Sequence, residues 1–376
     1  MRRGTKIQKL KQVLPGIVKD VRHYAKPRVK LHNEGLGDYY TEGYRSLNQR
    51  EWKGVRDTAY DFASWLKVYG YMAVTLGKHP VALTKSFVRY PWMASYLTVA
   101  NMLDRHKLGL RGKQLRYTQE QFYGVVHNSV DVIAKIIERD ENLNSPNNKR
   151  AAKLRAKTVM FDEMTPSIIM AGFPMLDWID IAMSPVCLPG EVDQNANIMY
   201  VDAAERMGLA ADVCPLPSAE VGCAIVDDYP QVGSSFITSS MPCDGSLGAA
   251  LFMDRYMKKL PSFTLTPPQR FNEPETNAYA VKDLKNCIRF IEETYNVKWD
   301  WDAFWKKAEE YNKTTQCMLD KWDVNCTPYP QVIGSALSLQ REYEFQTAAC
   351  LDPFMTKQDE KVTKTVSYTH LRAHET

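Results

Sequence analysis

Residues 234–250, SSFITSSMPCDGSLGAA, decide the fold. The run Phe236–Thr238 has the apolar and β-branched residues of a buried strand, and Pro242 marks its end. Small residues follow at 245–250, where they can open a helix close to the strand. A strand that leads into a helix through a short loop is the repeating unit of a parallel sheet.

The same alternation of strands and helices continues in the neighbouring parts of the sequence. Further short apolar runs lie at 168–172 and 211–214, and helical periodicity recurs at 196–207, 218–227 and 248–260. Two longer amphipathic helices are predicted at 276–295 and 302–319, the second with Asp302 as its N-cap. We therefore expect an α/β fold with a parallel sheet flanked by helices.

Residues 51–160 have a different pattern. Apolar residues recur there at i, i+3 and i+4 spacing, with turn residues at 77–80 and 108–112, which predicts a helical region. The polar run 142–155 is expected to be a surface connection. We expect this layer to serve packing and not chemistry.

Composition limits the class of protein. Of the 376 residues, 44% are hydrophobic and 24% charged, which is typical of a globular protein. No apolar run reaches the roughly 18 residues of a membrane span. Eight cysteines are too few for a disulfide scaffold of this length. We expect a reduced, soluble, cytoplasmic protein without membrane contact.

The net charge of +4 is unevenly distributed. Residues 1–30 contain ten lysines and arginines and a single acid, Asp20. A basic arm of this kind can bind nucleic acid, cover anionic ligand groups, or remain solvated. Because no nucleic-acid module follows it, we expect no nucleic-acid partner.

The last residues, 366–376, resemble a translated sequencing adapter and are expected to be foreign to the protein. We therefore expect the sequence to be a fragment of a longer chain. His370 and His374, spaced like a metal-binding pair, are excluded for the same reason.

All eight cysteines lie at position 187 or later, and none has CxxC spacing. Cys223, Cys287 and Cys317 occur within helical periods and are expected to be buried hydrophobic residues. Cys187, Cys214 and Cys243 instead follow apolar runs, in loops rich in proline and glycine. Such loops meet at the carboxyl edge of a parallel sheet, so these thiols either hold an iron–sulfur cluster or have no role.

The helix start at 243–250 is a second candidate site. Its free N–H groups suit an anion, although neither GxGxxG nor GxxxxGK[ST] is present. The alternative is an ordinary turn capped by Asp244 or Ser246. A serine hydrolase is disfavoured because the chain has no GxSxG motif.

Several motifs together resemble the 2-hydroxyacyl-CoA dehydratase family, which includes benzoyl-CoA reductase subunits. They are CPLPSAEVG at 214–222, FITSS at 236–240, the Cys243-Asp244 pair, LPSFTLTPP at 260–268, the helices of 276–319 and PYPQVIG at 328–334. The resemblance covers about residues 185–345.

The resemblance implies two flavodoxin-like domains per subunit, of which the second would be missing here. It also implies a [4Fe-4S] cluster on three cysteines, with Cys214 and Cys187 as two ligands. The third ligand would come from the second domain, with Cys326 and Cys350 as weak substitutes, and Cys243 would be a neighbour of the site. Ser218 and Asp244 are the catalytic candidates, while Gly245 and Ser246 are candidates for binding the anionic groups of coenzyme A.

The implied reaction removes water from a 2-hydroxyacyl-CoA through a ketyl radical. A second dehydratase subunit, in a heterodimer, and an ATP-dependent iron–sulfur activator protein are the implied partners. The alternatives are a benzoyl-CoA-reductase-type subunit and a non-catalytic electron-relay or scaffold subunit. The predicted division is a basic arm at 1–50, a helical region at 51–165, the cluster-binding domain at 166–345, a linker or the start of a second domain at 346–365, and the adapter at 366–376.

Overall fold

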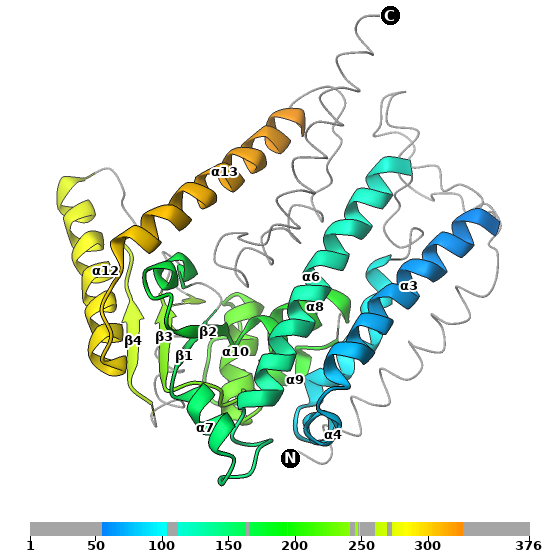
Figure 1. Cartoon of the computed structure of the whole chain (residues 1–376), viewed down its shortest axis with the longest axis horizontal. Coiled ribbons are helices and arrows are strands. Elements are labelled where there is room, and N and C mark those ends of the chain that lie inside the picture. Colours follow the sequence, from blue (N-terminus) through cyan, green and yellow to red (C-terminus); the bar gives the residue numbers. More distant parts are fainter. Residues whose placement is uncertain are drawn as a thin grey trace, which may run out of the picture.

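The computed structural model describes residues 55–103, 112–162, 165–193, 195–240, 245–246, 248, 260–268 and 273–325. The helices of the N-terminal part are α3 (Val55–Leu76), α4 (Pro80–Arg89), η2 (Pro91–Leu103), α6 (Gly112–Arg139) and α7 (Lys149–Arg155). They form one side of the molecule, with α3 packed along α6 (Figure 1). This agrees with the predicted helical region, except that the polar run at 142–155 ends in α7, which Asn148 caps by accepting the Ala151 N–H.

Four parallel strands form the sheet that the described residues contain. They are β1 (Thr158–Phe161), β2 (Asp177–Asp180), β3 (Ser235–Ser239) and β4 (Ser262–Leu265), arranged in the order β2-β1-β3-β4. This is the order of a flavodoxin-like sheet, which reverses direction of growth between β1 and β3. The predicted parallel sheet is confirmed, and β1 lies within the range that was expected to be helical.

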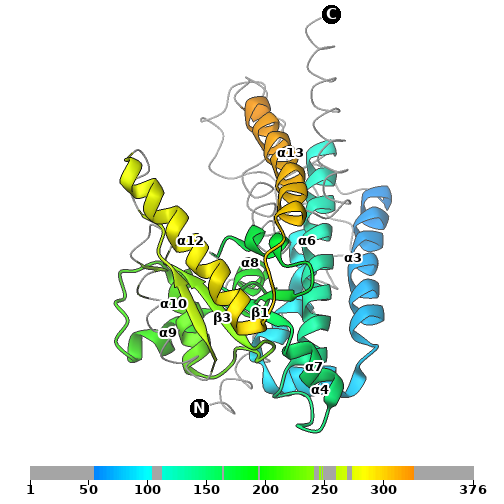
Figure 2. The same ribbon diagram turned by 60° about the vertical axis from the view of Figure 1, so that its left-hand side comes forward.

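Helices cover both faces of this sheet (Figure 2). Between the strands the chain forms η3 (Ser167–Gly172), η4 (Met183–Cys187), α8 (Leu188–Val192), α9 (Ile198–Arg206) and α10 (Pro215–Ile225), and α12 (Pro274–Tyr295) and α13 (Trp301–Asn325) follow β4. Two predicted strands are therefore wrong. Residues 168–172 form a 3₁₀ helix after Pro166, and 211–214 form the turn before α10.

Alternate residues of β1 belong to two different cores. Met160 packs in the cluster that contains the N-terminal helices, whereas Val159 and Phe161 pack in a second cluster with Cys287 and Ile291 of α12. A strand buried on both faces reads as a continuous apolar run, as TVMF does here. Because neighbouring side chains of a strand point to opposite faces, the sheet is the wall between the two cores.

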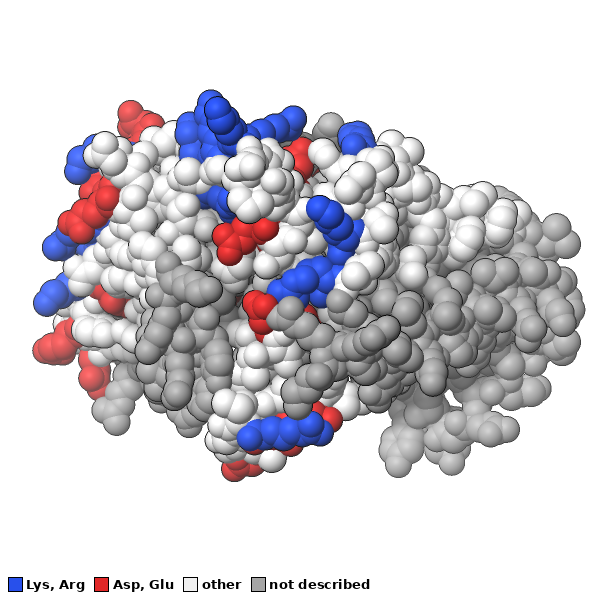
Figure 3. All heavy atoms as spheres, turned by 90° about the horizontal axis from the view of Figure 1, so that it is seen from below, with Lys and Arg blue, Asp and Glu red and all other residues white. Residues whose placement is uncertain are grey.

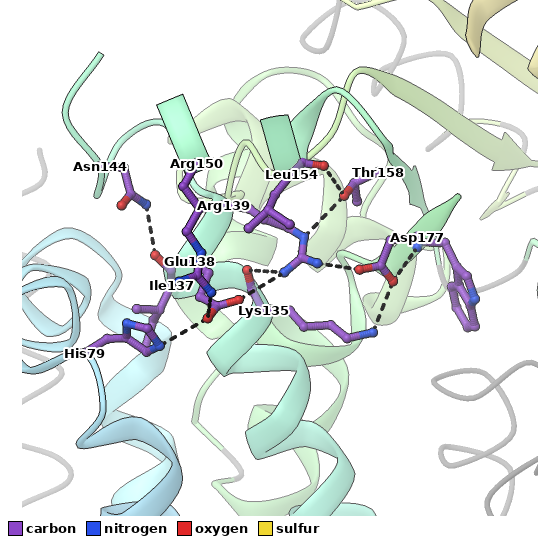
Figure 4. A network of polar contacts seen from close by, with 11 residues as sticks. His79, Lys135, Ile137, Glu138, Arg139, Asn144, Arg150, Leu154, Thr158 and Asp177 are labelled. Carbon is purple, nitrogen blue, oxygen red and sulfur yellow. Dashed lines mark hydrogen bonds and ion pairs between the residues drawn. The ribbon is translucent and has the colours of Figure 1, made fainter. Parts of the chain in front are cut away.

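A polar network fixes α6 to the amino ends of β1 and β2 (Figure 4). Arg139 donates to the Thr158 hydroxyl at 3.2 Å and forms an ion pair with Asp177, the first residue of β2. Lys135 contacts the same carboxylate at 3.2 Å. This network lies at the end of the sheet opposite the predicted site, so it orients the strands without lining that site.

Charged side chains of both signs are intermixed on the face seen from below (Figure 3). The described part of this face carries no continuous basic surface of the kind that binds nucleic acid. Among the described residues, no helix combines the length and apolar character needed to cross a bilayer.

Helix α13 begins at Trp301, one residue before the predicted start, and its cap lies two residues before the predicted one. Asp300 and not Asp302 is its cap, because the Asp300 carboxylate accepts the Ala303 N–H at 2.9 Å. Asp302 lies inside the first turn, where an acid still favours the helix dipole.

Candidate functional site at the carboxyl edge of the sheet

Three strands end in polar residues at one edge. Asp162 follows β1, Asp180 is the last residue of β2, and Ser240 follows β3. Because all the strands are parallel, these ends lie at one edge of the sheet, and the direction of growth changes between β1 and β3, which is the position where sheets of this kind bind their ligands. This edge is where a ligand is expected to bind.

Asp162 and Thr238 join the two central strands, β1 and β3, at this edge of the sheet. The Thr238 hydroxyl donates to the Asp162 carboxylate, and the Asp162 N–H donates to the Ile237 carbonyl at 3.1 Å. Both side chains are buried. Sequence analysis missed Asp162, although an acid directly after a buried apolar run is the signal that would have found it.

Asp180 shapes the segment that leads to Cys187. Its carboxylate accepts the backbone N–H groups of Ala182 and Met183, at 3.0 and 3.2 Å. The chain then forms the single π-helical turn η4, which ends at Cys187. Turns of this type are common at functional sites because they move a side chain out of regular helical register.

Cys187 is 4% exposed and packs in a small apolar cluster with Ala182 and Met183. Leu216 of α10 completes this cluster. Other elements hold the same turn, because the Asn197 amide donates to the Val186 carbonyl at 3.0 Å. Cys187 is therefore fixed in position just inside the edge.

Cys214 is exposed and lies immediately before α10. Pro215 starts that helix, as proline favours at a first helical position. The Ser218 hydroxyl donates to the Cys214 carbonyl at 3.0 Å and is itself buried, so Ser218 holds the backbone of Cys214. Because Leu216 lies only two residues after Cys214, its packing against the cluster that contains Cys187 brings the two cysteine segments together.

The remaining predicted site residues and cysteines are either buried or lie outside the described residues. Gly245 and Ser246 are buried and begin a helical segment. Cys243, Asp244, Cys326 and Cys350 lie outside the described residues, as does the side chain of Cys317. Cys223 and Cys287 are fully buried, as predicted.

Tyr229 was not predicted as a site residue and is buried in the core cluster that contains the N-terminal helices. Burial raises the pKa of Tyr229 well above its ordinary value, and the charges of Glu220, Cys223, Asp162 and Cys187 raise it further, in that order. The phenol therefore stays protonated at neutral pH and can only act as a neutral hydrogen-bonding group.

A surface cavity of about 230 Å³ opens beside β2. It is lined by residues of α6 and by Trp178, Ile179 and Asp180 of β2. Asp180 is the one residue that it shares with the edge described above. The cavity therefore borders the outer strand and does not lie between Cys187 and Cys214.

Cys187 and Cys214 are the described residues that were expected to be cluster ligands. Their thiols, one exposed and one just inside the surface, are of the soft ligand type found in iron–sulfur sites. No group of three or more His, Cys, Asp or Glu residues within the described part is arranged to hold a metal ion.

Residues 192–350 match the family described as 2-hydroxyglutaryl-CoA dehydratase, D-component. The predicted resemblance to the 2-hydroxyacyl-CoA dehydratase family is confirmed. The matched dehydratase segment contains Cys214 and Ser218 and begins five residues after Cys187. No curated protein matches the chain.

Proposed function

We propose that the chain is a subunit of an iron–sulfur dehydratase that removes water from a 2-hydroxyacyl-CoA. The observation that carries the proposal is the packing of Leu216 against the cluster of Ala182, Met183 and Cys187, because it brings the two predicted ligand segments side by side. The dehydratase match over residues 192–350 supports the same reaction class.

Cys187 and Cys214 would hold a [4Fe-4S] cluster, with the third ligand outside the described residues. A cluster held by three thiolates supplies, when bound, an electron and an open iron that acts as a Lewis acid. Ser218 acts as a positioning residue, because its hydroxyl holds the Cys214 carbonyl. We propose this role in place of the direct catalytic role expected from sequence.

The reaction needs electron transfer because the hydrogen to be removed is on the β-carbon, which a thioester does not acidify. An electron placed on the thioester allows the 2-hydroxyl to leave and makes the β-hydrogen acidic, and the electron is then recovered. The proposed partners are accordingly an ATP-dependent iron–sulfur activator, a second dehydratase subunit and the acyl-CoA. These components belong to an anaerobic, cytoplasmic enzyme.

Binding of coenzyme A is proposed at the helix start that contains Gly245 and Ser246. Backbone N–H groups at such a position attract phosphate oxygens, and a glycine allows a ligand to approach the backbone closely. Asp244, in the same segment, stays a catalytic candidate on the strength of the resemblance alone.

Anaerobic reconstitution with iron and sulfide, then reduction with dithionite and electron paramagnetic resonance, tests the proposal. We expect a cluster signal in the full chain and its loss in Cys214→Ala. Cys287→Ala is the matched control, because Cys287 is buried against the opposite face of the sheet, and it should keep the signal. Equal iron binding by Cys214→Ala and the control would refute the ligand assignment.

A turnover assay separates the catalytic role from the alternatives. The chain is combined with its partner subunit, the activator, ATP and a 2-hydroxyacyl-CoA, and enoyl-CoA formation is followed. A cluster signal without turnover would favour the electron-relay subunit, whereas reduction of benzoyl-CoA would favour the reductase-type subunit.

A further inference from the structure

Helix α3 has an apolar face that points away from the core. Phe62, Leu66 and Val74 are 47%, 49% and 69% exposed on this face. The small residues between and beside them are exposed too, namely Ala59, Ala63, Gly70, Ala73 and Gly77. The opposite side of the helix is the one that enters the core, through Val68, Met72 and Leu76.

The same face is almost free of charge. Lys67 flanks it, but its ammonium group lies over the Tyr123 ring, 3.7 Å from the ring centre, and is thereby drawn toward α6. An exposed apolar face whose flanking lysine is directed toward α6 favours a contact with another apolar surface.

Large and small residues on this face are placed symmetrically about position 68. Leu66 and Gly70 lie two residues on either side of it, and Phe62 and Val74 lie six residues on either side. The remaining small residues follow the same symmetry, as Ala63 with Ala73 and Ala59 with Gly77.

This symmetry is what an antiparallel pair of identical helices requires. A two-fold axis at the level of position 68 brings each residue into the same layer as its counterpart in the other copy. Leu66 then meets Gly70 of the second copy, so that a large side chain fills the space left by a missing one. Gly70 has that space, because a Cβ atom there would meet no other atom within 4 Å.

We propose that this face of α3 is a dimer interface, on which a second copy of the chain docks with its own α3 antiparallel. The inference does not depend on the proposed dehydratase function. One helix face buries less than the roughly 800 Å² per partner of a standard interface, so the dimer is weak and forms only at high concentration.

Sedimentation equilibrium of the full chain over a wide concentration range tests the proposal. We expect a monomer–dimer equilibrium, and at least a tenfold higher dissociation constant for Leu66→Gln. Val81→Gln is the matched control, because Val81 of α4 is 69% exposed but lies outside α3, and it should leave the equilibrium unchanged. A wild-type chain that stays monomeric, or equal dissociation constants for the two variants, overturns the proposal.

Cross-linking with a short bismaleimide tests the antiparallel arrangement. A mixture of Phe62→Cys and Val74→Cys chains should cross-link, since the two positions share a layer. Phe62→Cys alone should not, because its two copies would lie about 18 Å apart along the axis. Wild type under the same conditions reports the reaction of native thiols such as Cys214. Preferential cross-linking of Phe62→Cys with itself indicates parallel helices and overturns the proposal.

Discussion

Gly222 of α10 lies directly against the backbone of Tyr200 in α9. A Cβ atom at position 222 would be 1.7 Å from the Tyr200 carbonyl oxygen, a distance at which the two helices must separate. The position of Cys214, just before α10, therefore depends on the absence of a side chain about two turns further along the helix.

We predict that Gly222→Ala destabilises the fold by roughly 2–4 kcal/mol through overpacking. The measurement is urea unfolding followed by circular dichroism. Gly70→Ala is the control, because that helical glycine has no atom within 4 Å of an added Cβ, and alanine there should stabilise by about 0.5–1 kcal/mol. A loss in Gly222→Ala no larger than 0.5 kcal/mol would contradict the close helix contact.

The junction between the helical layer and the sheet domain contains a buried acid, and its titration should be visible in stability. Burial raises the pKa of Asp140 from 3.8 to about 6, despite hydrogen bonds from the Tyr90 hydroxyl and the N–H groups of Asn142 and Gln231. The folded state thus holds this proton more tightly than the unfolded chain. Its stabilising contribution is full below about pH 4 and is lost as the pH rises through 6, a change on the order of 2–3 kcal/mol.

Asp140→Asn should remove this part of the pH dependence. Unfolding midpoints in urea, measured from pH 4 to pH 7, give the comparison with wild type. An unchanged slope between pH 4 and 6 in the variant would show that another group is responsible.

Arg89 connects the two parts of the chain through ion pairs with Asp227 and Asp228, at 3.0 and 3.2 Å. The Asp228 side chain is only 4% exposed, so Arg89→Ala leaves a buried charge without its cation and should cost about 3 kcal/mol. Arg150→Ala removes an arginine that is 77% exposed and should cost less than about 1 kcal/mol. Equal losses for the two variants in chemical denaturation would contradict the role of Arg89.

Thiol accessibility should separate Cys214 from its buried counterparts. Brief alkylation of the folded chain followed by peptide mass spectrometry should label Cys214 and leave Cys187, Cys223 and Cys287 unmodified. Urea should make all four reactive. Fast labelling of Cys187 in the folded chain would show that the cluster of Ala182, Met183 and Leu216 does not shield its thiol in solution.

The sequence was sufficient for elements with a clear period and clear ends. The long helices α12 and α13 were predicted because their apolar periods continue over many residues. β3 was predicted because its run FITS has apolar and β-branched residues and a clear end at Pro242. β1 was missed because its three apolar residues, Val159–Phe161, come soon after a helix without glycine or proline between them, and so read as a continuation of that helix. The opposite error occurred at residues 168–172, which were predicted to be a strand and form a 3₁₀ helix. A short apolar run does not distinguish a strand from a helical turn.

The site was predicted in part, for a physical reason. Cys214 and Cys187 carry a local signal, because a cysteine between prolines at the end of an apolar run is unusual. Asp162 carries only the weak signal of an acid directly after an apolar run, and Tyr229 carries none, since a single phenol acquires its meaning only when distant segments fold around it. Their selection requires the strand order, which a single sequence does not specify.

The division of β1 between two cores has a practical meaning for anyone who wishes to shorten the chain. A version starting at Thr158 would expose Met160 and the rest of that sheet face to water, and we expect it to aggregate and not to fold independently. Heating the intact protein should accordingly melt both layers in one calorimetric peak, because the N-terminal helices and one face of the sheet share a single core.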